Sequence, residues 1–161
     1  MSKVLKVEYD VKVDGKSIEK IDGVDKIGKW VSEKLNAHAV GYAEEFGKDL
    51  ATADKPLTAS QIRNVFGEVR RIQMKMMDNW ETVESSVLLL RPKLAYSAKR
   101  ASAKAGRNEI HVADKLNAVL SEGLKAVSEG ANEQDKKRRF QNFADFFEAV
   151  LAYHKASGGK D

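Results

Sequence analysis

Apolar residues recur along most of the chain at the three- and four-residue spacing that places side chains on one face of a helix. The first such stripe predicts a helix over about residues 25–50 and consists of Ile27, Trp30, Val31, Leu35, Ala39, Tyr42, Phe46 and Leu50. Thr58 and Gln61 then have the spacing of a capping box, which predicts that a second helix begins there and extends to about residue 80.

Three further helices are expected in the second half of the chain. Arg91-Pro92 predicts a helix start, because the missing N–H of proline needs no partner in the first turn, and Gly106 predicts its end. Another apolar stripe covers about residues 110–127, and Asn132 can cap a last helix that Ser157-Gly158-Gly159 terminates. The last stripe is rich in phenylalanine, and we expect part of it to contact another subunit.

The first 22 residues differ from the rest. Val7, Tyr9, Val11 and Val13 alternate with polar residues, and Asp14-Gly15 follows as a turn signal, so a β-hairpin is one interpretation. A loosely held extension is the other, because a lone hairpin is marginally stable. We therefore predict an all-α fold, a compact bundle of about five helices over residues 23–161, with a short N-terminal extension or hairpin over residues 1–22.

Composition limits the possible classes of protein. The 161 residues suit one domain, and a hydrophobic fraction of 42% is enough for a core. Cysteine is absent, which excludes disulfides and thiolate metal sites. No signal peptide is evident and no run approaches the ~20 apolar residues of a membrane helix, so a cytoplasmic location is expected.

The net charge of +4 is concentrated in one part of the sequence. Residues 58–107 carry ten Lys or Arg and four Asp or Glu, a charge of +6, whereas the remainder carries −2. Between Arg91 and Arg107 there are six basic residues and no acidic one. Such a segment attracts phosphate, and nucleic acid is the natural partner.

The helix expected after Pro92 places Lys93, Arg100 and Lys104 within roughly 40° of one another, and Arg107 extends this basic line. Ser97 lies on the same side, while Leu94, Ala98, Ala101 and Ala105 form a separate packing stripe. The pattern favours contacts with consecutive phosphates of one strand, although an ordinary solvated face remains an alternative. Tyr96 could stack on a base, but we expect it to fill a gap in the core.

Two other basic clusters give weaker signals. Arg63 and Arg70 share a helix face, with Gly67 between them where a backbone could approach. Arg71 and Lys75 are expected to pair with the neighbouring acids Glu68 and Asp78. The third cluster, residues 135–139, is equally compatible with a binding surface and with a solvated helix start, since acids flank it.

Catalysis finds little support in the sequence. His38, His111 and His154 are far apart, and each is expected to be a surface or packed histidine, without metal-ligand spacing. No phosphate-binding loop or nucleophile elbow is present, and Asp145 with Glu148 is expected to be an exposed pair. We therefore expect no enzyme activity, no cofactor and no bound metal.

Three blocks, LTASQIRNVFG at residues 57–67, LLRPKLAYSAKR at 89–100 and FADFFEAVLAYHK at 143–155, resemble the small helical subunit of type III-A CRISPR effector complexes, the Csm family. The resemblance covers roughly residues 25–157. It implies a non-catalytic helical bundle, present in several copies, that stacks along the backbone subunits and contacts CRISPR RNA and target RNA in antiviral defence. The backbone and large subunits, and further copies of the chain in a filament or dimer, are the implied protein partners.

The candidate RNA-binding residues come from two arguments. Matching positions in the first two blocks carry over Arg63, Arg91, Lys93, Lys99 and Arg100, and the helical-face argument adds Arg70, Lys104 and Arg107. The alternative function is a helical DNA-binding or nucleoid-type protein, which would use the same basic residues on a duplex.

Overall fold

The computed structural model describes residues 5–53, 56–105 and 112–159, without the side chains of residues 102–105. An antiparallel hairpin of β1 (Glu8–Val13) and β2 (Lys16–Asp22) comes first. Within these ranges there are six helices: α1 (Gly23–Ser32), α2 (Ala37–Thr52), α3 (Ala59–Met76), α4 (Trp80–Ala105), α5 (Val112–Ser128) and α6 (Glu133–Ala156). The predicted helical bundle with an N-terminal hairpin is confirmed, with six helices in place of about five.

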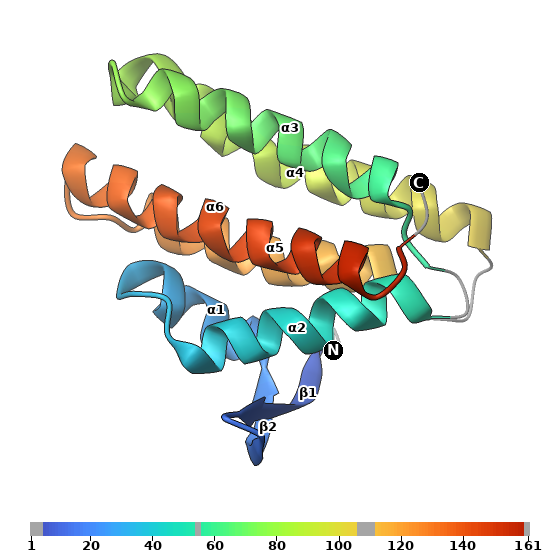
Figure 1. Ribbon diagram of the computed structural model, residues 1–161. Coiled ribbons are helices and arrows are strands. Elements are labelled where there is room, and N and C mark those ends of the chain that lie inside the picture. Colours follow the sequence, from blue (N-terminus) through green and yellow to red (C-terminus); the bar gives the residue numbers. More distant parts are fainter. Residues whose placement is uncertain (1–4, 54–55, 106–111, 160–161) are drawn as a thin grey trace.

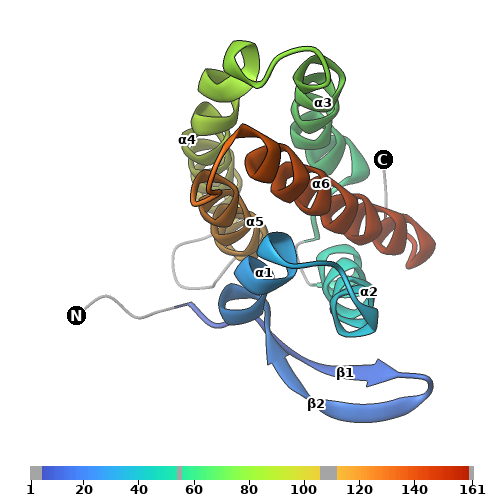
Figure 2. The ribbon, with the colours of Figure 1, turned by 90° about the vertical axis from the view of Figure 1, so that its left-hand side faces the viewer.

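The helices lie in three tiers, seen from the side in Figure 1 and along the bundle in Figure 2. The first tier consists of α3 and α4, the middle tier of α5 and α6, and the third of α1 and α2, with the hairpin beyond it. The α6 helix packs against α2, α3 and α5, and α5 packs against α4 and α1. Helices α3 and α4 therefore form one outer side of the bundle.

The centre of the core is aromatic and is built around α6. Phe140, Phe143, Phe146 and Phe147 are each at most 1% exposed. Phe146 lies beside Trp30 and Tyr42, and Phe147 beside Phe66, from helices α1, α2 and α3 respectively. The expectation that part of this face contacts another subunit is wrong for these four rings, because the middle position of α6 gives them partners within the chain.

The first predicted helix is in fact two helices. Between α1 and α2 the chain leaves the helical conformation, and the side chain of Asn36 accepts a hydrogen bond from the backbone N–H of Ala39 to start α2. The apolar period continues across the break because both helices bury that face, in α1 with Ile27 and in α2 with Phe46. A capping residue thus overrides the uninterrupted pattern.

The predicted helix start at Pro92 is also wrong, because α4 is continuous from Trp80 to Ala105. Proline removes one backbone hydrogen bond from a helix interior and clashes with the preceding turn. The buried residues Val83, Val87, Leu90 and Leu94 form one stripe that continues through this point, so packing favours an unbroken helix. By contrast, the start of α3 is confirmed, with Thr58 and Gln61 forming the capping box.

The hairpin is confirmed and belongs to the packed structure, so the loosely held alternative does not describe residues 5–22. Asp14 and Gly15 adopt the positive φ values of 53° and 79° that a tight hairpin turn requires. Val7, Val11 and Ile21 are at most 2% exposed, and β1 rests on α2. A side chain at Gly41 would collide with Val11, which explains the glycine at this close contact.

Polar contacts fasten the hairpin to the helices. The Tyr42 hydroxyl donates a hydrogen bond to the carbonyl of Val7, and the Tyr9 hydroxyl donates one to Asp49. Lys115 of α5 forms an ion pair with the same carboxylate at 2.8 Å. Burial, followed by the hydrogen bond to Asp49, raises the pKa of Tyr9 well above its ordinary value. Among the described residues, no helix is both long enough and apolar enough to span a membrane.

Candidate nucleic-acid interface

Two adjoining hollows of about 290 and 210 Å³ lie between α3 and α4, where α5 closes one end. They share four lining residues and together form what we call the α3–α4 groove. The shared residues are Asn64, Val65, Leu94 and Ser97. Side chains of both helices line these hollows, which are open to solvent.

The packing of α4 determines which of its basic residues reach this groove. Leu94 and Ala98 are each 4% exposed, as the sequence predicted for the packing stripe. Lys93, Ser97 and Arg100 therefore point to the α3 side, and all three line the groove. The Lys93 ammonium lies 3.9 Å from the Glu68 carboxylate, a contact too long and too exposed to be a strong ion pair.

Tyr96 lies at the rim of the groove and does not fill a gap in the core. Its side chain is 64% exposed, so the expectation of core packing is wrong. The reason is its position on α4, which is about 160° around the helix from the buried stripe even though Leu94 and Ala98 are close in sequence. The guanidinium of Arg100 lies 5.8 Å from the centre of the Tyr96 ring.

Two predicted residues of α3 make contacts within the chain. The Arg70 guanidinium pairs with Glu148 of α6 at 2.9 Å and lies 5.0 Å from the centre of the Phe66 ring. The Nε–H of Arg63 donates to the carbonyl of Ala59 at 3.4 Å. The predicted pairing of Arg71 with Glu68 is confirmed at 3.0 Å. A Cβ atom at Gly67 would meet open space, so this position leaves room for an approaching molecule.

The remaining predicted residues do not share one face. Arg91 and Lys99 are exposed, but helix geometry places them about 160° and 120° around α4 from Lys93. The side chain of Lys104 and all of Arg107 lie outside the described residues. The structure thus brings Lys93 and Arg100 together at the groove and separates them from Arg91 and Lys99.

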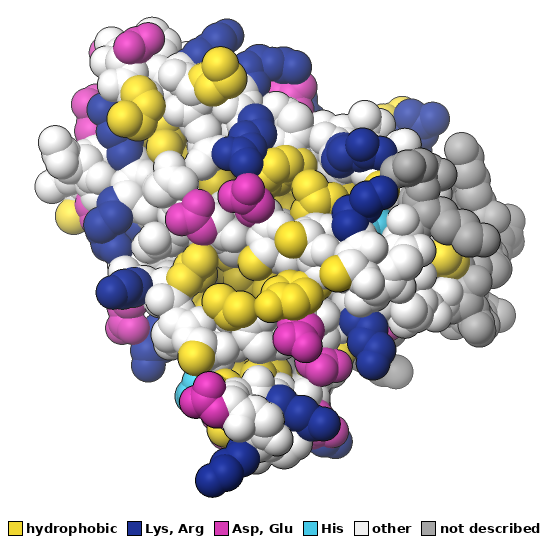
Figure 3. Space-filling model, viewed as in Figure 1, with side chains coloured by type: hydrophobic (Ala, Val, Ile, Leu, Met, Phe, Trp, Pro, Cys, Tyr) yellow, Lys and Arg dark blue, Asp and Glu magenta, His cyan; other side chains and the backbone are white. Residues whose placement is uncertain are grey.

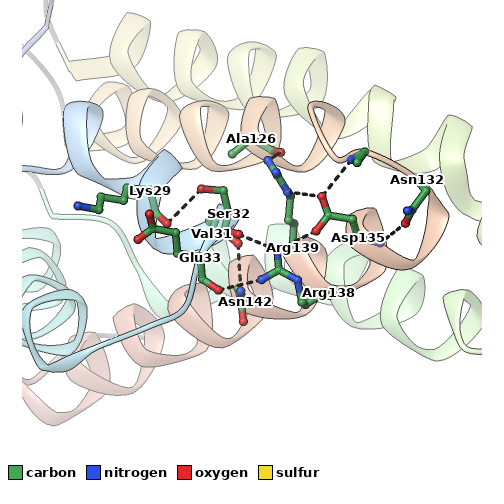
Figure 4. A network of polar contacts seen from close by, with 11 residues as sticks. Lys29, Val31, Ser32, Glu33, Ala126, Asn132, Asp135, Arg138, Arg139 and Asn142 are labelled. Carbon is green, nitrogen blue, oxygen red and sulfur yellow. Dashed lines mark hydrogen bonds and ion pairs between the residues drawn. The ribbon is translucent and has the colours of Figure 1, made fainter.

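A second group of basic residues, at the start of α6, has a different environment, shown in Figure 4. Arg138 donates to the carbonyls of Ser32 and Glu33 at the end of α1, at 2.7 and 2.8 Å, and also to Asp135. These carbonyls are left without helical partners where α1 ends. Arg138 therefore caps another helix of the same chain.

Arg139 completes this network, which we call the α6 arginine cluster (Asp135, Arg138 and Arg139). It donates to the carbonyl of Ala126 in α5 at 2.8 Å and to Asp135 at 3.1 Å. The backbone N–H of Ala131 and the Arg138 guanidinium hold the pKa of Asp135 below its ordinary value. Both side chains join helices of the same chain, so a simple solvated helix start does not describe Arg138 and Arg139.

The face formed by α2, α3 and α6 carries basic and acidic side chains side by side, together with a band of apolar ones (Figure 3). Such mixing favours solvation and intramolecular pairs such as Arg70 with Glu148. The basic part of the α3–α4 groove is different, because Glu68 is the single acidic residue among the described residues that line it.

The described residues hold no group of three or more His, Asp or Glu side chains placed to bind a metal ion. His154 is fully buried, with Nε2 at 2.7 Å from the carbonyl of Leu57, which confirms the prediction of a packed or surface residue. His38 is exposed on α2, and His111 lies outside the described residues.

Sequence reasoning missed three residues of the groove, Gln61, Asn64 and Asn117. Their carboxamides come from α3 and α5, and nothing in the local pattern of either segment marks them as neighbours. The capping box did identify Gln61, but only as part of a helix start.

Comparison with known proteins gives one match. The model of the family described as Csm2 Type III-A matches residues 33–160. No curated protein and no solved structure matches the chain. The hairpin and α1 precede the matched residues, which include the whole α3–α4 groove. Since the match covers most of the 161 residues, the chain belongs to the Csm2 family, the small subunit of the type III-A CRISPR Csm complex.

Proposed function

We propose that this chain is a non-catalytic, RNA-binding structural subunit of the Csm complex that stacks in several copies along the complex and contacts the phosphates of guide and target RNA. The observation that carries the proposal is the pair Lys93 and Arg100 at the rim of a solvent-open groove, where Glu68 is the single acid among the described lining residues. Membership of the Csm2 family supports it, as does the position of α3 and α4 as an outermost tier.

The mechanism is electrostatic. Lys93 and Arg100 are seven residues apart on α4, a rise of about 10 Å, which allows them to meet different phosphates of one strand. Each neutralised phosphate releases condensed counterions, so affinity falls as salt rises. Phosphate contacts position the strand without reading its sequence. Lys104 continues the same line on α4, and we include it and Arg107 in the proposed interface.

The other predicted residues have secondary places in the proposal. Arg91 and Lys99 would meet RNA only from other sides of α4, and Arg63 from near the start of α3. Arg70 would have to exchange its contact with Glu148 for a phosphate. The backbone and large subunits, and neighbouring copies of the chain, are the proposed protein partners in the assembly.

Binding of a short single-stranded RNA by the purified full chain, measured between about 50 and 200 mM salt, tests the proposal. The test variant is Lys93→Glu/Arg100→Glu. The matched control is Lys26→Glu/Lys48→Glu, which changes net charge equally at exposed lysines of α1 and α2 in the opposite tier. A duplex DNA of the same length is the competing ligand.

The wild type and the control should bind RNA with the same steep salt dependence. The test variant should bind at least tenfold more weakly, and the slope of log affinity against log salt should fall by about 1.4, the share of two single-strand phosphate contacts. No binding by the wild type at the lowest salt, or equal binding by test and control variants, would overturn the proposed interface. Tighter binding of duplex DNA would instead support a DNA-binding protein.

A further inference from the structure

The α3–α4 groove contains carboxamide groups whose hydrogen-bonding capacity is not used within the described structure. Asn64 is exposed on α3, and its side chain makes no hydrogen bond to another described residue. Gln61 uses only its oxygen, which accepts from the backbone N–H of Thr58. Asn117 accepts from the Ser121 hydroxyl at 3.0 Å, and its NH₂ group has no described partner. At least one NH₂ donor on each residue is therefore available.

Apolar side chains line much of the larger hollow of the groove. Leu57, Val65, Leu94 and Leu116 line its larger hollow, and all but Val65 are at most 6% exposed. The volume of about 290 Å³ is close to the lower limit of about 300 Å³ found for small-molecule sites. Apolar walls with a few convergent polar groups suit a flat, heteroaromatic ligand of the size of one nucleobase.

We propose that the α3–α4 groove holds one unstacked nucleobase of the RNA strand whose phosphates lie on Lys93 and Arg100. This inference rests on the proposed function and deepens it, because it adds contact with a base to contact with the backbone. The two basic residues lie at the rim of the hollows that the amides line, so a strand held there has a base within reach of the groove. The base comes from an unpaired position of the strand.

Asn64 is the residue that contacts the base edge. Its carboxamide offers a donor and an acceptor side by side, which match N7 and the N6 amino group of adenine. Gln61 and Asn117 contribute donors, which suit the ring nitrogens and carbonyl oxygens of any base. The groove therefore accepts all four bases and binds adenine best.

The competing location for a base is the exposed ring of Tyr96. Aromatic rings stack on bases regardless of sequence, and Arg100 lies over the same ring. A base stacked there would remain outside the larger hollow, which Tyr96 does not line. Substitution of Asn64 would remove the affinity gained from a base in the groove, and substitution of Tyr96 would remove the affinity gained from a base on the ring. The experiment includes both variants.

The test compares two RNA strands with identical phosphates, an oligoadenylate and the same strand with abasic residues. Both are titrated against the full chain at one low salt concentration. The variants are Asn64→Leu, which removes the carboxamide at nearly constant size, Tyr96→Ala, and the control Gln134→Leu. Gln134 is an exposed amide in the first turn of α6, away from the groove. Circular dichroism confirms that each variant is folded.

The wild type and Gln134→Leu should bind oligoadenylate about tenfold more tightly than the abasic strand, the effect of one well-held base. Asn64→Leu should lose this preference but keep its affinity for the abasic strand. Equal binding of both strands by the wild type would overturn the base site and leave phosphate binding intact. Loss of the preference in Tyr96→Ala but not in Asn64→Leu would place the base on the tyrosine ring, and no binding of either strand would overturn both proposals.

Discussion

The α6 arginine cluster and the basic rim of the α3–α4 groove are similar in sequence but different in structure. Each places basic residues close together on one helix. In α6, Arg138 and Arg139 bind the carbonyls of Ser32, Glu33 and Ala126. In α4, Lys93 and Arg100 meet one acid at 3.9 Å and one tyrosine ring. Lys93 and Arg100 are thus less fully paired within the described structure than Arg138 and Arg139.

The reason for this difference is partly visible in the local sequence. Asp135 lies three and four residues before Arg138 and Arg139, so a carboxylate on the same helix face orients both guanidinium groups toward α1 and α5. No acid occurs between Arg91 and Arg107. The basic residues of α4 therefore have no carboxylate on their own turn of helix, and phosphate is a suitable partner.

The largest expected effect is on stability and concerns Arg139. Arg139→Ala should lower the free energy of unfolding by about 1–3 kcal/mol, because it removes the bonds to Ala126 and Asp135 and leaves a carbonyl without its donor. Lys137→Ala is the matched control, because Lys137 makes no contact of this kind with a described residue. Denaturant titration measures both. Equal midpoints for the two variants would contradict a structural role of Arg139.

The next effect separates two sides of α4. Arg100→Glu should weaken RNA binding about tenfold, because it replaces a phosphate contact by repulsion. Arg91→Glu should weaken it only about twofold, since Arg91 lies on the far side of the helix and its charge acts through screened, long-range attraction. Titration of the same RNA at one salt concentration compares them. If Arg91→Glu has the larger effect, the RNA follows a different face of α4.

A smaller effect, in the opposite direction, is expected at Glu68. Glu68→Gln should tighten RNA binding about two- to fivefold, because the Glu68 carboxylate no longer competes with phosphate for Lys93. Its pair with Arg71 is exposed and contributes little to stability. Glu44→Gln on α2 makes the same change of charge in the opposite tier. Tightening by both variants to the same degree would show that only net charge matters.

The smallest effect concerns pH and Asp135. The pKa of this carboxyl is lowered by the Ala131 N–H and then by Arg138, so its charged form is favoured in the folded protein. The stabilisation is therefore complete above the ordinary carboxyl pKa of 3.8 and is lost as pH falls through the lowered value. Unfolding of wild type and Asp135→Asn should differ at neutral pH and converge in acid. A difference that grows on acidification would contradict this linkage.

Local signals in the sequence predicted the local parts of the fold. The Thr58–Gln61 capping box located the start of α3, and the period of Leu94 and Ala98 identified the buried side of α4. The sequence did not predict the break before α2 or the unbroken course of α4 through Pro92. Before α2, the Asn36 cap outweighed the continuous apolar period. In α4, packing of the buried stripe outweighed the tendency of proline to start a helix.

The candidate site was predictable in part, for the same reason. Lys93 and Arg100 could be placed on one line because they belong to one helix. The carboxamides of Asn64 and Asn117 meet only because α3, α4 and α5 pack together, and no periodicity in the sequence reports such a meeting. Arg138 contacts carbonyls more than 100 residues away in the chain, so its role was also invisible before the fold.

The most direct test of the groove assignment is a paired measurement on two variants that each lose two positive charges, Lys93→Ala/Arg100→Ala and Arg138→Ala/Arg139→Ala. Each is assayed for its denaturation midpoint and for RNA affinity at low salt, under conditions where it is folded. We predict that the first variant loses affinity and keeps the wild-type midpoint, whereas the second loses stability and keeps its affinity. Equal losses of affinity in both variants would show that RNA responds to net charge alone and would contradict the assignment of the groove.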